Sequence, residues 1–541
     1  MTSSSPLTSQ IESDSGPHIE WNVHYDATCS IYTHPRHLAA LALMTGHHPP
    51  PIEEARILEL GCATGGNLTP IAMSLPKSEC VGIDPFAAQI KTARQRAHQA
   101  QVDNVTYLPI GVSDLDQLEG KFDYIIAHGL FSWVSDEHRE DTLKLCRALL
   151  SPKGIAYISY NTYPHWHLEQ VTRSLLRWQH EHLKRSPSEL SSDQVIRESR
   201  GLLSAFTRYT DVKRGSPIHN VYQDSDDRLK RLPDWYIVHE YLLENNRAFY
   251  FEEWIRMLSE YDLAYLGDAA SNTELSISMI PQALLNELKR IDNDKISVHQ
   301  GIDFLVNRSL RRSIICHGSQ RQDDSAPIST QPWTTQTLKD SEIFDQLFVA
   351  SPYMPKGDLE HLSQVVMFND VTTFKEKTFS SRNAAQTALL LLVGSVWPRQ
   401  VSLRSLMDQA QALLTDYGLW GSGAQTQLCH ALHVLLYLDI IFHPTWGRML
   451  PPTPVKRSIH SLPQFLPLIE SLVDQWPQSF TNYHHNPSFP SKALHWLISN
   501  YTERYDRAQW DELLQESPLA HTSIDDLFAE AEQLGLLSSS E

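Results

Sequence analysis

The sequence predicts an α/β fold whose first part is a doubly wound, largely parallel sheet and whose later parts are mainly helical. Between residues 55 and 161, short apolar runs that suit buried strands alternate with amphipathic helical patterns. Such alternation implies parallel strands with helices on both faces. A strand pattern at Arg56–Leu60 leads into a glycine-rich turn, a helical pattern at Asn67–Leu75 and a second strand that ends at Asp84. This order is half of a doubly wound nucleotide-binding unit.

The turn after the first strand has the features of a ligand-binding loop. It contains Gly61, Gly65 and Gly66, and glycines allow a sharp turn that brings backbone N–H groups close to a ligand. The helix that follows offers further N–H donors in its first turn. A dinucleotide site would have the pattern G-x-G-x-x-G. Here the pattern is Glu59-x-Gly61-x-Ala63-x-Gly65, so the turn differs from that of a dinucleotide site.

The position of Glu59 distinguishes between two classes of nucleotide ligand. A carboxylate two residues before the first glycine would repel a pyrophosphate, but it suits a ligand whose amino-acid end is positively charged. S-adenosylmethionine is such a ligand, because it carries an ammonium and a sulfonium and no phosphate. Asp84 then stands where these units place a carboxylate on ribose hydroxyls. The pattern predicts S-adenosylmethionine as the cofactor, with contacts from Glu59, Gly61, Cys62, Ala63, Gly65 and Asp84.

Composition excludes several classes of protein. The chain of 541 residues is long enough for about two to four domains. Its 45 basic and 64 acidic residues give a net charge of −19, which argues against a general nucleic-acid binder. The six cysteines form no C-x-x-C pair, so neither a zinc site nor a disulfide framework is indicated. We expect no metal, because carboxylate or cysteine partners at ligand spacing are lacking around His430, His433, His484 and His485.

No targeting or membrane-spanning segment is predicted. The stretch Met1–Gly16 is polar and rich in serine, without the basic and apolar regions of a secretory signal. The longest apolar run, Ala388–Trp397, is shorter than the ~20 residues that span a bilayer. We therefore expect a cytoplasmic protein with reduced thiols and no membrane partner. Its oligomeric state cannot be derived from the sequence, although a dimer is one option.

The remaining elements of the first domain follow in order. They are helices at Ala87–Gln101 and His138–Leu150 and strands at Asn104–Pro109, Lys121–Ala127 and Ile155–Asn161. In open α/β sheets, ligands bind beyond the carboxyl ends of the strands. The exit loop of the third strand should therefore meet the adenine ring, and Gly111 and Val112 are predicted to contact it.

Aromatic and amide side chains follow the fourth and fifth strands, where a methyl acceptor would lie. His128 leaves the fourth strand, and Tyr160, Asn161 and Tyr163 end the fifth. Aromatic faces can hold the stem of a lysine and stabilise its ammonium, so these four residues are candidate acceptor contacts. Core packing under a covering helix would also explain any one of them. The loop Ala127–Leu130 lacks the N/D-P-P-Y motif of DNA-base and glutamine methyltransferases, which disfavours those acceptors.

Two further segments have alternative interpretations. The aromatic residues within His18–Leu43 suit either a cover over the cofactor or packing of the first helix on the sheet. The cluster Arg308, Arg311 and Arg312 could bind an anion, or it could form intramolecular ion pairs.

The domain boundaries follow from composition. A polar linker with two prolines begins at His317, and apolar helical runs with a short strand pattern after it suit a winged-helix-like unit. We predict a disordered tail (1–17), a cofactor-binding domain (18–167), a helical middle domain (168–316), a linker (317–334) and a mainly helical C-terminal domain (335–541).

A further set of short blocks is spread over roughly the first three-fifths of the chain. These blocks are Tyr25-Asp26, Thr33–Pro35, Leu38–Ala40, Leu58–Ala63, Gly65–Asn67, Ile126–Gly129, Ser132–Val134, Ser159–Pro164, Tyr250-Phe251, Tyr265–Gly267, Asp303–Leu305 and Asn307-Arg308. Together they resemble one bacterial family, whose members join a Rossmann-like class I S-adenosylmethionine-dependent methyltransferase domain to a methyltransferase regulatory domain. The best known members are rickettsial protein-lysine methyltransferases. One departure is His165, which precedes Trp166 where the family commonly has glycine.

The resemblance implies a methyltransferase that uses S-adenosylmethionine. By analogy it implies that the acceptor is a lysine of a protein, such as an outer-membrane or surface protein. Because fold does not fix function, two alternatives stay open. One is a methyltransferase for a small molecule, and the other is a non-catalytic scaffold that binds the cofactor.

Overall fold

The structure is a computed structural model, and its described parts include a complete central sheet. The described residues are 29–184, 191–211, 216–270, 273, 280–292, 295–320, 343–356, 361–370, 378–381, 383–397, 400–437, 445–446, 480–481 and 487–488. The predicted tail (1–17) and most of the predicted linker (317–334) lie outside these residues, as do Tyr25 and Asp26.

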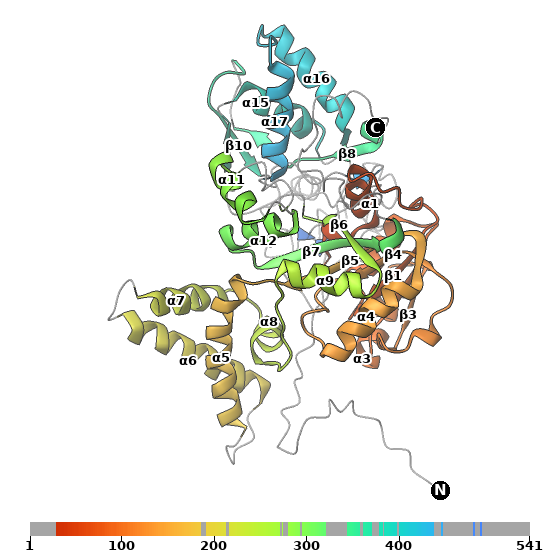
Figure 1. Ribbon diagram of the computed structural model, residues 1–541, viewed down its shortest axis with the longest axis vertical. Coiled ribbons are helices and arrows are strands. Elements are labelled where there is room, and N and C mark those ends of the chain that lie inside the picture. Colours follow the sequence, from red (N-terminus) through yellow and green to blue (C-terminus); the bar gives the residue numbers. More distant parts are fainter. Residues whose placement is uncertain are drawn as a thin grey trace, which may run out of the picture.

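Seven strands form one mixed sheet in the order β3-β2-β1-β4-β5-β7-β6 (Figure 1). The first five strands pair in parallel, as the alternation of strands and helices predicted. The last two pair antiparallel, β7 with β5 and β6 with β7. The strands are β1 (Arg56–Leu60), β2 (Glu79–Ile83), β3 (Val105–Leu108), β4 (Phe122–Ala127), β5 (Leu150–Asn161), β6 (Leu263–Asp268) and β7 (Leu310–His317).

Hydrophobic cores cover both faces of the sheet. On one face pack α1 (Pro35–Met44), α2 (Leu68–Ser74) and α3 (Ala87–Gln99). On the other face pack α4 (Asp136–Leu149) and α9 (Phe251–Glu260). Because side chains alternate along a strand, β5 sends Tyr157 into the first core and Tyr160 into the second. This alternation decides which predicted site residues can meet.

The middle part of the chain is helical but also contributes β6 and β7 to the sheet. A separate core joins α5, α6, α7, α8 and the turn η4, and α5, α6 and α7 project away from the sheet (Figure 1). The prediction of a helical domain over 168–316 missed the strand at Leu310–His317, whose pattern begins with arginines and reads as a basic amphipathic element. The helices are α5 (His165–Leu183), α6 (Ser192–Thr210), α7 (Pro217–Leu229), α8 (Asp234–Ile237), a π-helical turn η4 (Val238–Leu242), α11 (Gln282–Ile291) and α12 (Lys295–Leu305).

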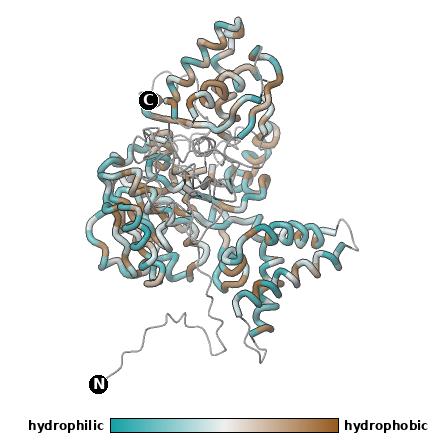
Figure 2. Tube along the Cα trace, turned by 180° about the vertical axis from the view of Figure 1, so that it is seen from behind, coloured by the Kyte–Doolittle hydropathy of each residue, from teal (hydrophilic) through white to brown (hydrophobic). Residues whose placement is uncertain are grey.

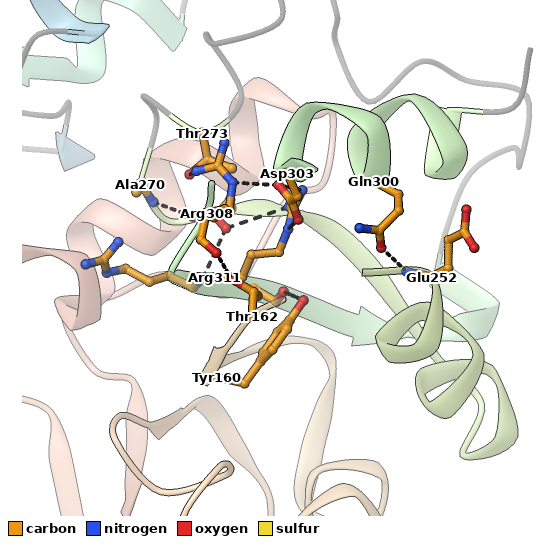
Figure 3. Close-up of polar contacts among 12 residues, drawn as sticks. Tyr160, Thr162, Glu252, Ala270, Thr273, Gln300, Asp303, Arg308 and Arg311 are labelled. Carbon is orange, nitrogen blue, oxygen red and sulfur yellow. Dashed lines mark hydrogen bonds and ion pairs between the residues drawn. The ribbon is translucent and has the colours of Figure 1, made fainter. Parts of the chain in front are cut away.

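A buried ion-pair cluster joins α12 to β7. The Asp303 carboxylate accepts hydrogen bonds from the Arg311 guanidinium at 2.7 and 2.9 Å and from Arg308 Nε at 2.6 Å (Figure 3). Arg311 and Asp303 are fully buried, and the Arg311 guanidinium lies 3.8 Å from the centre of the Phe251 ring on α9. Of the two interpretations of the arginine cluster, intramolecular pairing therefore holds for Arg308 and Arg311.

The described C-terminal elements run helix, short strand, helix, helix and short strand, the order of a winged-helix-like unit. These elements are α15 (Ala384–Ser395), β12 (Val401–Ser402), α16 (Leu403–Asp416), α17 (Ala424–Tyr437) and β13 (Thr445–Trp446). Their common core includes Ala40 of α1, so α1 packs on both the sheet and this unit. Figure 2 shows hydrophobic and hydrophilic residues mixed in this part of the molecule. The buried residues of α16 share one face, as expected of an amphipathic helix, and they are Leu403, Leu406, Met407, Ala410 and Leu414.

Smaller elements complete the described C-terminal part. A short helix, α14 (Ile343–Gln346), precedes β8 (Leu347–Val349), which pairs with β12 and β13. Two further antiparallel sheets consist of β9 (Tyr353–Pro355), β10 (Val366–Asp370) and β11 (Thr378–Ser381), and of β14 (Phe480–Thr481) and β15 (Pro487–Ser488). Among the described residues, no helix combines the length and the apolar character needed to cross a bilayer.

Replacing Asp303 by alanine should destabilise the sheet strongly. The substitution leaves the charges of Arg308 and Arg311 without their carboxylate in a buried place, which costs about 3–5 kcal/mol. Urea unfolding followed by tryptophan fluorescence measures the loss. The control is Glu287→Ala, because the pair of Glu287 with Arg290 is exposed. This substitution should change the free energy of unfolding by less than about 1 kcal/mol. Equal small effects of both substitutions would contradict the role of Asp303.

Candidate functional site

The turn between β1 and α2 is held in an unusual backbone conformation. Gly61, Ala63 and Gly65 have positive φ angles of 69°, 46° and 78°. Only glycine fits at Gly65, because an added Cβ would lie 2.6 Å from the hydroxyl oxygen of Tyr107. The positive φ of Ala63 is strained for a residue with a side chain. This strain is offset by a hydrogen bond of 3.1 Å that the Ala63 N–H donates to Asp84 Oδ2.

Asp84 lies at the carboxyl end of β2, facing the turn. In addition to the Ala63 N–H, its carboxylate accepts the Phe86 N–H at 3.0 Å. The side chain is buried, and burial raises the pKa of its carboxyl group. Asp84 thus fixes the turn, and it stands beside the place predicted for the ribose.

Glu59 is buried, and only one of its two carboxylate oxygens has a hydrogen-bond partner among the described residues. Its Oε1 accepts a hydrogen bond of 2.7 Å from Asn67 Nδ2, whereas Oε2 is buried and has no partner among the described residues. Burial raises the pKa of Glu59 to about 7, opposed by the Asn67 hydrogen bond and assisted by the charge of Asp84. A buried, unpaired carboxylate oxygen next to a glycine turn fits a cationic donor such as an ammonium, as the sequence pattern predicted.

Asn67 connects this carboxylate to the segment before the first strand. Its Oδ1 accepts hydrogen bonds from Thr33 Oγ1 at 2.8 Å and from the Ser30 N–H at 3.3 Å. Asn67 directly follows the glycine pair, but the sequence pattern did not predict it as a site residue. These contacts place the segment around Thr33 at the turn, while the helix that follows it packs on the sheet. Packing of the first helix on the sheet, one of the two roles considered for His18–Leu43, is therefore confirmed, whereas residues 18–28 lie outside the described residues.

The loops after β3 and β4 border the same turn. The Gly111 N–H donates to Asp114 Oδ2 at 2.8 Å, and Val112 is buried in the core that also contains Ile83 at the end of β2. An added Cβ on Gly61 would lie 3.2 Å from Leu130 Cδ1, so the loop after β4 closes on the turn.

His128 is partly buried and lies beside two hydroxyl groups of β5. Its Nδ1 lies 2.9 Å from the Tyr157 hydroxyl oxygen and 3.2 Å from Ser159 Oγ, and neither residue was singled out by the sequence. The Ser159 hydroxyl also accepts the Gly129 N–H at 2.9 Å. Burial, assisted by the charge of Arg312, lowers the pKa of His128 to about 4. The imidazole is therefore neutral at pH 7.

The other three predicted acceptor residues lie in different surroundings. Tyr160 is buried on the opposite face of the sheet, with its ring centre 4.6 Å from that of Trp254. Asn161 is buried and donates from Nδ2 to Asn246 Oδ1 at 3.4 Å. Tyr163 is partly exposed beyond the end of β5. The structure therefore brings His128 and Glu59 to one face of the sheet and leaves Tyr160 on the other.

The departure at His165 has a local structural role. Its Nε2 lies 3.2 Å from Glu169 Oε1, and its Nδ1 lies 3.3 Å from Asn307 Nδ2. His165 thus bridges α5 and the end of α12. A glycine at this position could not make these contacts.

Comparison with known proteins identifies the family. Residues 58–156 match the family model described as "Methyltransferase domain", and residues 233–317 match "Predicted methyltransferase regulatory domain". The protein RP789 of Rickettsia prowazekii is 35% identical over 407 residues, which cover 74% of this chain and 69% of that protein. The chain belongs to the class I S-adenosylmethionine-dependent methyltransferases that carry a methyltransferase regulatory domain.

Further relatives of this methyltransferase agree. The protein RP028 of the same organism is 34% identical over 224 residues, covering 41% of this chain and 87% of that protein. The solved structure of PKMT2 from Rickettsia typhi, in complex with AdoHcy, has the same fold, with a TM-score of 0.73, 23% identity, and coverage of 95% of this chain and 98% of the other. The methyl donor of this methyltransferase is S-adenosylmethionine, as the turn predicted. The regulatory match includes β6 and β7, so this region is part of the central sheet.

Binding of S-adenosylmethionine should weaken as the pH falls below about 7, the pKa of Glu59 in the free protein. An ammonium beside the carboxylate favours its charged form, so ligand binding releases a proton in this range. The dissociation constant should rise by up to about tenfold per pH unit. Calorimetric titrations between pH 5.5 and 8.5 measure this slope. The variant Glu59→Gln should bind S-adenosylmethionine weakly and with little dependence on pH. If the pH dependence persists in the variant, it does not come from Glu59.

Proposed function

We propose that this methyltransferase modifies lysine side chains of a protein. The observation that carries the proposal is a surface groove between α9 and α12, with a volume of about 560 Å³. An open groove suits a polypeptide acceptor, whereas a small-molecule acceptor calls for an enclosed pocket. Its lining combines the aromatic rings of Tyr250 and Phe304 with the carboxylates of Glu252, Glu253 and Glu260.

The Tyr250 end of the groove lies beside the segment that leaves the carboxyl end of β5, where an acceptor must arrive. The Tyr163 N–H donates to the Phe249 carbonyl oxygen at 3.2 Å, which places the two segments side by side. From there a row of rings leads outward, with Tyr163 5.1 Å from Tyr250 and Tyr250 5.8 Å from Phe304 between ring centres. Tyr163, a candidate acceptor contact, thus lies between the end of the strand and the groove.

The charge of the groove suits a basic segment. Glu252 and Glu260 are exposed one helical turn on either side of Arg256, while Glu253 is paired with Arg247 at 2.6 Å. Carboxylates beside aromatic faces attract the ammonium and guanidinium groups of lysine and arginine. The resemblance of the sequence blocks to rickettsial protein-lysine methyltransferases supports the same acceptor.

The chemistry requires alignment and exclusion of water. Bound S-adenosylmethionine supplies an activated methyl group on its sulfonium, and the acceptor amine must be neutral to attack it. A free lysine has a pKa of about 10.4, and desolvation beside buried neutral groups lowers it. Neutral His128, with Tyr157 and Ser159, offers hydroxyl and imidazole groups at the carboxyl edge. Glu59 and Asp84 hold the cofactor, and Asn161 and Tyr163 are the proposed acceptor contacts.

Incubation of the enzyme with a bacterial lysate and methyl-labelled S-adenosylmethionine tests the proposal. Mass spectrometry of the labelled products should locate the methyl groups on protein lysines. Label that appears only in small molecules would overturn the protein acceptor. Cofactor binding without any label would instead support a non-catalytic scaffold.

The double variant Glu252→Lys, Glu260→Lys should methylate a protein acceptor with a KM raised by roughly tenfold, because two attractive charges become repulsive. Affinity for S-adenosylmethionine should stay unchanged, since the groove lies outside the cofactor turn. The control is Glu287→Lys on α11, an exposed position that does not line the groove. If the control and the double variant have the same KM, the groove is not the docking site.

A further inference from the structure

We propose that Arg312, from the regulatory region, binds the carboxylate of S-adenosylmethionine, so that Glu59 and Arg312 hold the two charged ends of its amino-acid moiety. The inference rests on the cofactor of the family and not on the lysine acceptor. No family match or sequence pattern assigns this role to Arg312.

The register of the sheet puts Arg312 on the same face as Glu59. On β7, Arg312 pairs with Ser159 of β5, whose hydroxyl contacts His128 at the end of β4. Glu59 of β1 pairs with Ile126 of β4, two residues before His128. Since side chains two residues apart share a face, Glu59, His128, Ser159 and Arg312 all lie on one face near the carboxyl ends of β1, β4 and β5.

Arg312 differs from its two neighbours in the arginine cluster. Arg308 and Arg311 are both paired with Asp303. Within the described residues, the guanidinium of Arg312 makes no ion pair, and its buried Nε has no hydrogen-bond partner. Its guanidinium carbon lies 4.5 Å from the centre of the Tyr32 ring. Arg312 is therefore available for the other role predicted for this arginine cluster, which is to bind an anion.

A continuous set of contacts connects Arg312 back to Glu59. The Arg312 guanidinium covers Tyr32, the neighbour of Thr33, and Thr33 Oγ1 donates to Asn67, which in turn donates to Glu59. On the sheet side, β1, β4, β5 and β7 are consecutive neighbours. The segment around Thr33 thus reaches both Glu59 on β1 and Arg312 on β7, beside the space beyond the carboxyl ends of β1, β4 and β5.

Two buried polar atoms beside this space, one of a carboxylate and one of a guanidinium, lack hydrogen-bond partners among the described residues. Glu59 Oε2 is an acceptor without a partner, and Arg312 Nε is a donor without one, among the described residues. The methionine moiety of the cofactor carries an ammonium and a carboxylate on one carbon, so it can satisfy both. Charge-assisted hydrogen bonds of this kind are among the strong ones in proteins.

Asp268, the acidic residue next to Arg312, does not take the place of the cofactor carboxylate. The carboxylate of Asp268 accepts the backbone N–H groups of Arg312 and Ala270 at 3.0 and 2.9 Å, and it lies 3.9 Å from Arg311 Nη1. It thus binds the Arg312 backbone and shares its charge with a second arginine. A basic acceptor would not bind to Arg312 either, which leaves the cofactor carboxylate as the anionic group to be recognised.

Calorimetric titration with S-adenosylmethionine and with its decarboxylated analogue tests the proposal. The wild-type protein should bind S-adenosylmethionine roughly 10- to 100-fold more tightly than the analogue. Arg312→Gln should lose this preference, because it weakens only the binding of the ligand that has the carboxylate. Arg312→Lys should retain part of it, since the charge remains.

The comparison of two ligands separates recognition from folding. Arg290→Gln on α11, an exposed position outside both the cofactor space and the groove, should keep the full preference and serves as the control. If Arg312→Gln weakens both ligands equally, or neither, the proposal is overturned. If the wild-type protein binds neither ligand, S-adenosylmethionine is not its cofactor.

Discussion

A buried carboxylate at the end of β1 constrains the rest of the site. Glu59 uses one oxygen to hold Asn67, and through Asn67 it holds the segment around Thr33. Its second oxygen is buried without a partner among the described residues, which is unfavourable in the free protein and raises the pKa to about 7. A cationic ligand removes this penalty and restores the charge. In the role we propose for it, the same residue selects a phosphate-free nucleoside and shapes the space that receives it.

The regulatory region, residues 233–317, is part of the sheet that carries this site. It contributes β6 and β7 to the sheet, and the buried pairs of Asp303 with Arg308 and Arg311 fix α12 against β7. Because β7 pairs with β5, any shift of this region would move the carboxyl end of β5, where His128 makes its contacts. The architecture therefore offers a physical route from a regulatory element to the cofactor space and the groove.

Local patterns in the sequence predicted the first half of the fold well. The turn at Gly61–Gly66 and the alternation of strands and helices identified five parallel strands and the cofactor. The strand at Leu310–His317 was missed, because its antiparallel partners are distant in sequence and its arginines suggest a surface. Tyr160 illustrates a second limit, since only the strand register reveals that it faces the core opposite to His128. Asn67 and Arg312 gain their roles from contacts between distant segments, which spacing alone does not encode.

We propose that two acids, Glu59 at the end of β1 and Asp84 at the end of β2, hold S-adenosylmethionine. Asp84 fixes the turn through two backbone N–H groups, and it lies beside the position predicted for the ribose. Calorimetry should therefore show binding of S-adenosylmethionine to the wild-type protein and an affinity lower by roughly 10- to 100-fold for the Asp84→Ala variant, with both proteins folded by circular dichroism. Equal affinities, or no heat of binding with the wild-type protein, would show that these acids do not hold the cofactor.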